Sequence, residues 1–478
     1  MVMKYFTEIM KIPRASGNEG AIAEYICDFA RERGLFCVKD ELNNVFVRKS
    51  ASKGFENRKP VLFQAHMDMV CEKATGSEHD FSKDPIIPVY LNGRVYADKT
   101  TLGADDGAGV AVMLRLMDES EPMGETEFLF TTSEETGMDG AAGFDYSLIR
   151  SEKVVNLDSE EELEACIGCA GNLTSEVRIP TKATDADGFL ASLEVFGLCG
   201  GHSGIEIDKG RASALKLLGT LLDAIYAAMP FGIVALSGGG RDNVIPFSAT
   251  ATICFYDKKE FTEAEKKVKE RKKEIALGLV KEDKARFGVS LKKLKESEKT
   301  DAHKKMLTFR STSAVISMLL LSPQGVIDRY PDSGEVLASV NLGHASVEEG
   351  AAVFRYLIRS ARKARVSNVL AQITRLSRVL GGECRTVSDC AGWESARGSE
   401  LQTAYRKACN EVFGKEPKFT VIHAGLECGI ISDGLASCGK VADIISIGPD
   451  VRDVHSPKES MDVASLDRLY RVAISLLS

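Results

Sequence analysis

Five short segments of the chain contain residue types that bind divalent metal ions. In chain order, these residues are His66 and Asp68, Asp105 and Asp106, Glu134 and Glu135, Asp158, and His455. Imidazole together with carboxylate is the ligand set expected for zinc or a similar ion. The segments hold more carboxylates than one ion needs, so they predict a two-metal site with one carboxylate left over as a general base. This pattern predicts metal-assisted hydrolysis.

Two of the segments contain paired residues that could have different roles at a metal site. Glu134 and Glu135 are adjacent at a strand end and point in different directions, so one can bind metal while the other stays free. The free carboxylate could take a proton from the attacking water and pass it to a leaving amine. His66 and Asp68 are two residues apart, which on an extended strand places both on one face, where Asp68 can orient His66. Taken singly, each segment also fits an acidic loop, a solvated turn or a core histidine.

Predicted strands place most of these residues at one edge of a sheet. Apolar runs at 60–65, 126–132 and 153–157 each end within two residues of a predicted ligand. Because open α/β sheets bind ligands at the carboxyl ends of their strands, these side chains should share one crevice. Asp105 lies instead on a glycine-flanked turn that opens a helix, close enough to project into the same crevice.

The chain of 478 residues is too long for one compact core. Helix and strand signals alternate up to residue 171 and again after 397, whereas 172–396 reads as antiparallel strands with amphipathic helices. Since His455 lies far beyond Asp158, one catalytic domain interrupted by an insertion explains the pattern. The sequence predicts a layered α/β catalytic domain with a mixed sheet, formed by 1–171 and 397–478, and an inserted α+β domain at 172–396.

Further elements follow from local patterns. In the first part, a helix is predicted at 19–33, ended by Gly34, and a strand at 44–48. In the insertion, the expected elements are strands at 189–198 and 249–257, a solvated helix and loop at 261–305, a strand at 335–343, a helix at 348–361 and a strand at 369–379. In the last part, they are helices at 401–414, from 425 and up to 477, and strands at 419–424 and 442–448.

Composition describes an ordinary globular protein, with 44% hydrophobic and 27% charged residues. The net charge of -8 argues against nucleic acid as a partner. The first residues contain no secretory signal, and no apolar run approaches the ~20 residues of a membrane span, which predicts a cytoplasmic protein without a membrane partner. The twelve cysteines are then expected to be reduced thiols, and Cys166 and Cys169 to be buried small residues, because this CxxC has no second pair.

Longer phrases resemble a known family. They are FQAHMDMVCEK (63–73), TLGADDGAGVA (101–111), NLDSEEE (156–162), IGCAG (167–171), GGHSGIEID (200–208), HAGLECG (423–429) and VHSP (454–457). In this order, they resemble the dinuclear zinc aminoacylase/carboxypeptidase/dipeptidase superfamily, and within it the bacterial aminoacyl-histidine dipeptidases (Xaa-His dipeptidase, peptidase D). The resemblance spans almost the full chain.

The resemblance implies a role for each matched residue. His66 and Asp158 would bind one zinc, Glu135 and His455 the other, and Asp105 would bridge them; manganese or cobalt could replace zinc. Asp68 would orient His66, and Glu134 would be the general base. His202 would polarise the scissile carbonyl or bind the substrate carboxylate, Asn243 would assist it, and His423 would lie near the substrate. The inserted domain would be a lid through which a homodimer forms, and the substrate would be a dipeptide, of the Xaa-His type or broader.

Two positions depart from the family pattern. Asp106 stands where family members usually have asparagine, and Ala391 precedes Gly392 and Trp393 where a proline is usual. Both departures leave open which dipeptides are preferred. The alternatives are an N-acyl amino-acid deacylase or an aminopeptidase with the same fold, or a catalytically inactive binding protein. The last is disfavoured because a binding protein needs no spare general base.

Overall fold

The computed structural model describes residues 2–120, 122–298 and 300–477. The chain divides into two compact units, each with its own hydrophobic core. Unit 1 comprises Met1–Cys169, Trp393–Ile422 and Leu426–Ser478, and unit 2 comprises Ala170–Gly392 and His423–Gly425. His423 therefore belongs to unit 2 although the residues on both sides of its short segment belong to unit 1.

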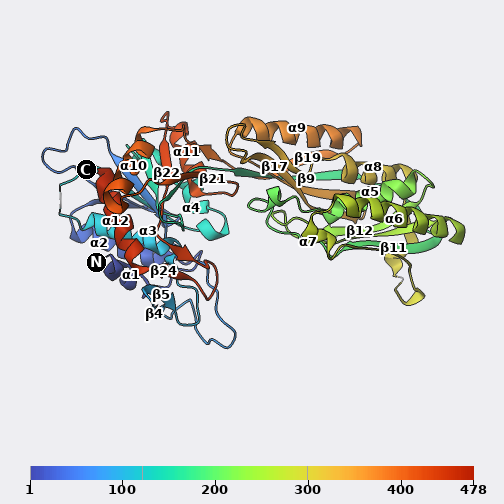
Figure 1. Ribbon diagram of the computed structural model, residues 1–478, viewed down its shortest axis with the longest axis horizontal. Helices are drawn as coiled ribbons and strands as arrows, with labels where there is room; N and C mark the ends of the chain where they lie inside the picture. The colour runs from blue at the N-terminus through green and yellow to red at the C-terminus, as the bar shows by residue number, and fades with distance from the viewer. Residues whose placement is uncertain (1, 121, 299, 478) are drawn as a thin grey trace. The chain divides into compact units, whose positions relative to one another are not determined.

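In the described part of unit 1, nine strands form the main sheet (Figure 1). The order is β1-β2-β6-β3-β7-β22-β8-β20, and β21 pairs with β8. The strands are β1 (Phe36–Lys39), β2 (Val45–Lys49), β3 (Val61–His66), β6 (Thr126–Thr131), β7 (Lys153–Asn156), β8 (Glu164–Cys169), β20 (Trp393–Glu394), β21 (Lys418–Ile422) and β22 (Asp443–Ser446). β3 is parallel to β6 and β7, whereas β2 is antiparallel to β6. The predicted mixed sheet is confirmed.

Alternating side chains of the central strands enter two cores, one on each face of the sheet. Phe63 of β3 packs in the core that includes α1, α2, α3, α10 and α12, whereas Leu62 packs in the core that includes α11. The helices are α1 (Met3–Ile9), α2 (Gly20–Glu32), α3 (Ala104–Met117), α4 (Asp139–Gly143), α10 (Glu400–Phe413), α11 (Glu427–Ser437) and α12 (Val463–Leu477). Helices thus cover both faces, which gives the layered α/β arrangement.

A small second sheet in unit 1 frames the segment that contains His455. Its order is β23-β24-β5-β4. The strands are β4 (Pro88–Leu91), β5 (Arg94–Ala97), β23 (Val451–Arg452) and β24 (Ser460–Asp462). His455 lies in the connection between β23 and β24.

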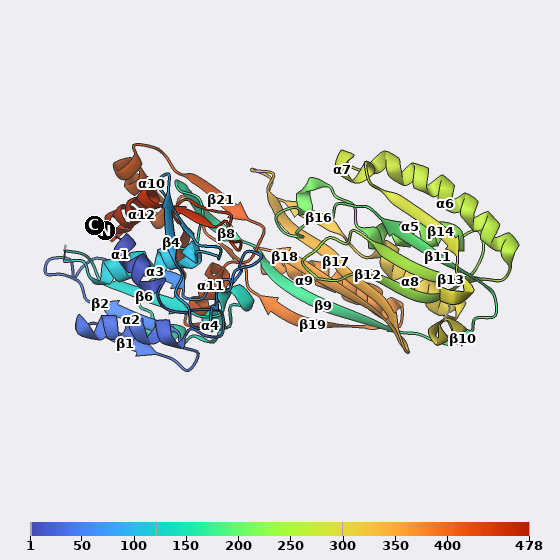
Figure 2. The same cartoon turned by 90° about the horizontal axis from the view of Figure 1, so that it is seen from below.

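In the described part of unit 2, nine strands form an antiparallel sheet in the order β14-β11-β13-β12-β17-β18-β9-β19, with β16 beside β17 (Figure 2). The strands are β9 (Gly171–Pro180), β11 (Phe189–Phe196), β12 (Gly232–Gly239), β13 (Ala249–Phe255), β14 (Gly288–Lys293), β16 (Gly325–Arg329), β17 (Val336–Glu348), β18 (Ala351–Ser360) and β19 (Glu383–Cys390). One core joins the sheet to α5 (Ala214–Tyr226), α6 (Lys258–Gly278), α8 (Phe309–Leu321) and α9 (Lys363–Val379). β10 (Ala183–Asp185) pairs separately with β15 (Lys305–Leu307).

Three predictions in unit 2 were wrong. The segment predicted as a helix at 348–361 is β18, and the predicted strand at 369–379 lies within α9. β18 lies between β17 and β9 and is buried on both faces, so its residues lack the alternation that identifies a strand. In α9, Val369, Ile373 and Ser377 are buried at helical spacing. The stretch predicted as solvated helix and loop also contains β14, an edge strand, where charged side chains can face solvent.

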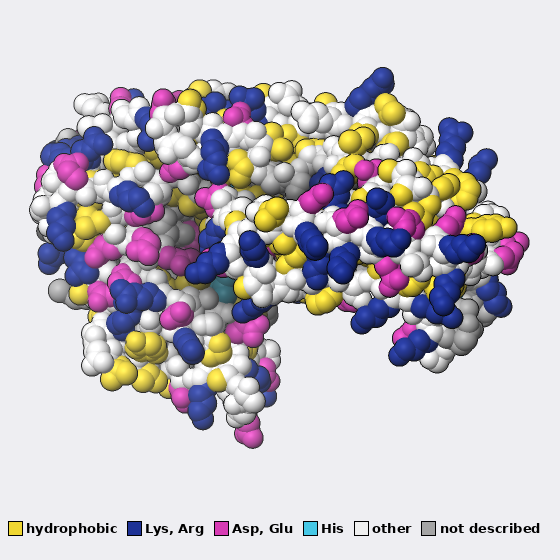
Figure 3. Space-filling view, turned by 45° about the vertical axis from the view of Figure 1, so that its right-hand side comes forward, with side chains coloured by type: hydrophobic (Ala, Val, Ile, Leu, Met, Phe, Trp, Pro, Cys, Tyr) yellow, Lys and Arg dark blue, Asp and Glu magenta, His cyan; other side chains and the backbone are white. Residues whose placement is uncertain are grey.

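Every helix in the described residues is too short or too polar to span a bilayer. On the face drawn in Figure 3, Lys and Arg side chains are interspersed with Asp and Glu. Cys166 and Cys169 are buried on β8.

Candidate active site

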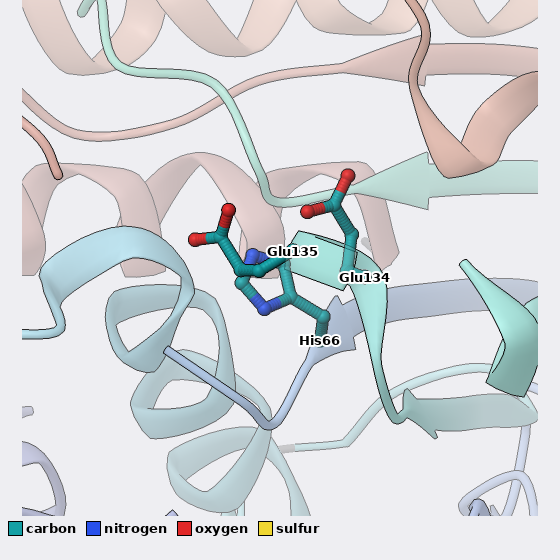
Figure 4. A group of neighbouring side chains, drawn as sticks. All are labelled: His66, Glu134 and Glu135. Atoms are coloured by element: carbon teal, nitrogen blue, oxygen red, sulfur yellow. The ribbon is translucent and has the colours of Figure 1, made fainter. Parts of the chain in front are cut away.

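Parallel strands of unit 1 bring three of the predicted metal-binding segments together. His66 is the last residue of β3, Glu134 and Glu135 follow β6 in a 3-10 turn (η1, Glu134–Thr136), and Asp158 follows β7. Because β6, β3 and β7 are adjacent and parallel, their carboxyl ends meet at one edge of the sheet. Figure 4 shows His66 beside the two glutamates, whose carboxylates extend from the η1 turn.

Asp105 lies between two groups of potential ligands. Its Oδ1 lies 3.0 Å from His66 Nε2, and Asp158 Oδ1 lies 3.5 Å from the same nitrogen. Its Oδ2 lies 3.1 Å from His455 Nε2, which is also 3.1 Å from Glu135 Oε1. In each group, one potential ligand atom per residue lies within 4.8 Å of the others. The two oxygens of the Asp105 carboxylate therefore face two different pairs of potential ligands, His66 with Asp158 and Glu135 with His455.

A third group includes Glu134. His66, Glu134 and Glu135 also place ligand atoms within 4.8 Å of one another. The side chain of Glu134 is largely buried, and this burial together with the charge of Glu135 raises the pKa of Glu134 to about 7. Glu135 contacts His455, whereas Glu134 does not belong to the group that contains His455.

Asp68 is completely buried and contacts His66 and the backbone of Glu134 and Glu135. Its Oδ1 accepts a hydrogen bond from the backbone N–H of Glu134 at 3.1 Å, and Oδ2 accepts from that of Glu135 at 3.3 Å. His66 Nδ1 lies 3.4 Å from Asp68 Oδ1 and 3.1 Å from the Asp68 carbonyl oxygen. These contacts leave Nε2 of His66 facing Asp105. Asp68 thus fixes the imidazole and the η1 turn together.

The donor set fits divalent cations because it concentrates negative charge away from water. The carboxylates that lie together at this edge of the sheet are those of Asp68, Asp105, Glu134, Glu135 and Asp158. Burial, reinforced by the charge of Asp105, raises the pKa of Asp158 well above its usual value. Bound cations would offset this repulsion, and carboxylate oxygens with imidazole nitrogens are the ligands that zinc, manganese and cobalt accept.

Asp106 does not join the ligand groups. It is 1% exposed, its Oδ1 accepts the backbone N–H of Gly109 at 3.0 Å, and Oδ2 has no partner among the described residues. Burial and the charge of the neighbouring Asp105 raise the pKa of Asp106 well above its usual value. Asp106 is therefore a buried neighbour of the ligands, at the position where family members usually have asparagine.

His202 lies in unit 2 and presents one ring nitrogen as a donor. Its Nδ1 accepts backbone N–H groups from Gly204 at 3.3 Å and Ile205 at 3.2 Å. Burial, with the charge of Arg359, lowers the pKa of His202. A neutral ring that accepts at Nδ1 holds its proton on Nε2. Nε2–H of His202 can then donate a hydrogen bond.

His423 and Arg359 lie near His202 in unit 2. His423 Nε2 lies 2.6 Å from Ser339 Oγ, and burial together with the charge of Arg359 lowers its pKa to about 4. Arg359 is 6% exposed, and its Nε has no partner among the described residues. Asn243 is exposed, and its carbonyl accepts the N–H of Ser203, next to His202. Among these four residues, Arg359 supplies the positive charge, and the two histidines beside it are neutral rings.

Arg359 was missed in the sequence analysis. It lies at the end of β18, which was wrongly predicted as a helix, so its place beside His202 and His423 could not be seen. The basic residue directly after the apolar run YLI was the available signal.

A model of one peptidase family matches most of the chain. The match covers residues 62–478 and its description is peptidase family M20/M25/M40. The cytosol non-specific dipeptidase of Escherichia coli is 35% identical over 99% of this chain and 96% of its own length. The chain therefore belongs to peptidase family M20/M25/M40.

Solved structures agree with this assignment. The aminoacylhistidine dipeptidase of Vibrio alginolyticus aligns with a TM-score of 0.90 and 31% identity over 100% of this chain and 96% of that one. The aminopeptidase PepT of Bacillus cereus aligns with a TM-score of 0.56 and 15% identity over 100% of this chain and 97% of that one, which supports the fold alone.

Proposed function

We propose that this protein is a metal-dependent dipeptidase that hydrolyses the peptide bond of Xaa-His or a broader range of dipeptides. The principal observation is that Asp105 lies between two sets of ligands while Glu134 remains beside them. The high similarity to two dipeptidases, one from Escherichia coli and one from Vibrio alginolyticus, supports the substrate class. We assign unit 1 as the catalytic domain and unit 2 as the inserted lid and dimerisation domain.

The proposed centre would hold two zinc ions, or manganese or cobalt in their place. His66 and Asp158 would bind one ion, Glu135 and His455 the other, and Asp105 both. When bound, such ions polarise a carbonyl group and lower the pKa of water. Asp68 holds His66 and the η1 turn in position through the contacts described above.

Glu134 is the proposed general base. Its carboxylate would take a proton from the attacking water and deliver it to the amine that leaves. The Glu134 backbone N–H is held by Asp68 at 3.1 Å, which limits the movement of the side chain at its root. This proton transfer requires a carboxylate that is not occupied as a ligand.

The group of unit 2 that contains Arg359, His202, His423 and Asn243 would provide the complementary part of substrate recognition. A dipeptide has a free carboxylate, and Arg359 offers a buried guanidinium to which a carboxylate can bind through two hydrogen bonds. His202 would donate from Nε2 to the scissile carbonyl oxygen, with Asn243 as a second donor, and His423 would lie near the substrate. We further propose that the protein is cytoplasmic and forms a homodimer through unit 2.

A substrate panel with chelator controls tests the proposal. The metal-loaded protein is assayed on dipeptides, tripeptides and N-acetyl amino acids of matched side chains, before and after treatment with EDTA and after return of Zn²⁺, Mn²⁺ or Co²⁺. We expect the highest kcat/KM on dipeptides, loss of turnover with EDTA and recovery with metal. Preference for N-acetyl amino acids would identify a deacylase, and preference for tripeptides an aminopeptidase. Binding of dipeptide without turnover would identify an inactive binding protein.

A further inference from the structure

Two buried residues of opposite charge contact the segment that contains Asp105 from both sides. Arg14 and Glu459 are each 2% exposed, and neither belongs to the proposed ligand set. Arg14 lies between α1 and α2, and Glu459 lies just before β24, four residues after His455. Burial of full charges costs free energy unless hydrogen bonds satisfy them, so the contacts of both residues define what they do.

Glu459 accepts hydrogen bonds from four consecutive backbone N–H groups. Oε2 accepts from Leu102 at 2.8 Å and Gly103 at 3.0 Å. Oε1 accepts from Ala104 at 2.7 Å and Asp105 at 3.3 Å. A carboxylate is suited to this because both oxygens accept and neither donates.

Arg14 contacts the carbonyl groups of the same region. Nη1 donates to the carbonyl oxygen of Met67 at 2.8 Å and to that of Asp68 at 2.9 Å, and Nη2 donates to the carbonyl oxygen of Gly103. The planar guanidinium reaches three carbonyls on two segments, which the single ammonium of lysine could not match in direction. Arg14 thus joins the end of β3 to the start of α3.

Gly103 lies between the two charges and must be glycine. Its φ is +68°, and a Cβ there would lie 2.5 Å from Arg14 Nη2 and 2.8 Å from Met69 Sδ. The absence of a side chain lets Arg14 bind the Gly103 carbonyl while Glu459 binds its N–H group.

We propose that Arg14 and Glu459 are positioning residues that together set the place of the bridging Asp105 relative to His66 and His455. Arg14 fixes residues 67–68, directly after His66, and Glu459 fixes residues 102–105 to the segment that contains His455. Arg14 also supplies positive charge beside the carboxylates of Asp68, Asp105 and Asp106. The inference rests on the proposed two-metal centre.

The test measures metal binding without reference to activity. Metal-free parent, Glu459→Gln, Arg14→Met and Arg14→Lys proteins are titrated with Co²⁺, and the visible absorption of the bound ion is recorded. We expect two Co²⁺ per parent chain. In Glu459→Gln, the side-chain NH₂ faces two N–H donors, so we expect Co²⁺ affinity about 10- to 100-fold weaker and an altered absorption spectrum. Arg14→Met removes the charge and the hydrogen bonds of Arg14, so we expect it to weaken Co²⁺ binding as well. Arg14→Lys keeps the charge and loses fewer contacts, so it should weaken Co²⁺ binding less than Arg14→Met does.

Glu127→Gln is the matched control. Glu127 is also completely buried in unit 1 and accepts backbone N–H groups from Arg150 at 3.0 Å and Ser151 at 2.9 Å. The other described partner of its side chain is Arg48, which is not a candidate ligand. We expect it to lower the melting temperature of the metal-free protein while leaving the Co²⁺ titration and spectrum as in the parent.

The outcomes separate the two hypotheses. The first outcome concerns a parent that binds two Co²⁺ and variants that are folded by circular dichroism. If Glu459→Gln and Arg14→Lys then bind Co²⁺ with the affinity and spectrum of the parent, the positioning role is wrong and the metal centre stands. An effect of Glu127→Gln as large as that of Glu459→Gln would show general loss of stability and also overturn it. A folded parent that binds no Co²⁺, Zn²⁺ or Mn²⁺ would overturn the proposed function and this inference with it.

Discussion

Glu134 and Glu135 are adjacent, yet the structure gives them different surroundings. Glu135 Oε1 lies 3.1 Å from His455 Nε2, whereas Glu134 does not belong to the group of potential ligands that contains His455. The preceding Ser133 has a φ of 57°, which turns the chain sharply after β6. The two substitutions to glutamine should therefore have different consequences, although they change the same atoms.

Glu134→Gln should retain metal and lose turnover. The amide cannot accept a proton from water, and loss of a general base typically lowers kcat about 100- to 10,000-fold. Metal content by elemental analysis and kcat are measured on one preparation. Glu135→Gln is the matched comparison, and it should lose metal. Near-parental kcat in metal-loaded Glu134→Gln would remove this residue from the reaction.

Protonation of His423 should lower the free energy of unfolding in mild acid. Its folded pKa of about 4 lies below the ordinary 6.5 because of burial and the charge of Arg359. The unfolded chain therefore binds the proton more readily, so stability is present above pH 6.5 and is lost as the pH falls toward 4. Between pH 7 and 4.5, the loss from this residue is about 2 kcal/mol.

The measurement compares the parent with His423→Gln, which keeps a polar side chain but does not titrate. The free energy of unfolding is obtained from urea denaturation at several pH values between 4.5 and 7. The parent should lose stability more steeply than the variant as the pH falls. Parallel curves would show that His423 titrates normally in the folded protein.

At the scale of elements, the start of α3 is the least regular part of the site. Asp105 and Asp106 have non-helical backbone angles at the first turn, and Gly103 precedes them with a left-handed φ of 68°. The parallel strands present their ligands by regular geometry, whereas Asp105 depends on this irregular start. The local backbone should therefore be sensitive to change.

Gly103→Ala should be more harmful than Gly414→Ala. Both glycines have a left-handed φ, at 68° and 66°, which costs alanine about 1–2 kcal/mol. A Cβ at Gly414, the C-cap of α10, meets nothing within 4 Å, whereas at Gly103 it would overlap Arg14 and Met69. We expect Gly103→Ala to lose a further ~1–3 kcal/mol of unfolding free energy and to bind metal more weakly. Equal losses in urea denaturation would contradict this.

At the scale of the whole molecule, the two units have separate cores, and the candidate ligands all lie in unit 1. A ligand that binds only the folded state of one unit stabilises that unit by mass action. At a free metal concentration 100 times the Kd, the gain is about 2.7 kcal/mol for one site. Metal should then affect the two units differently.

Differential scanning calorimetry with Zn²⁺ and with EDTA tests this expectation. The unit 1 transition should move to higher temperature with Zn²⁺, while the unit 2 transition stays in place. Asp105→Ala, which lacks the carboxylate shared by both ligand sets, should show little metal dependence. A single transition that moves as a whole would show that the two units unfold together.

Much of unit 1 could be predicted from local sequence. The strands before His66, Glu134 and Asp158 are short apolar runs, and α2 is followed by Gly34, whose φ is 65°. Such elements are identified by spacing along the chain, because side-chain direction repeats every 2 residues in strands and every 3.6 in helices. The chemical types of the candidate ligands were equally visible in the sequence, and the family resemblance implied a role for each.

The tertiary structure decided which residues meet. Arg14 and Glu459 belong to segments far apart in the chain, and both contact Gly103 only because α1, α3 and β24 pack in one unit. The strand β18 was misread because burial on both faces removes the alternation that marks a strand, and Arg359 was missed with it. Local sequence determines residue type and the direction of side chains along one element. Distances between elements depend on packing, which only the folded chain provides.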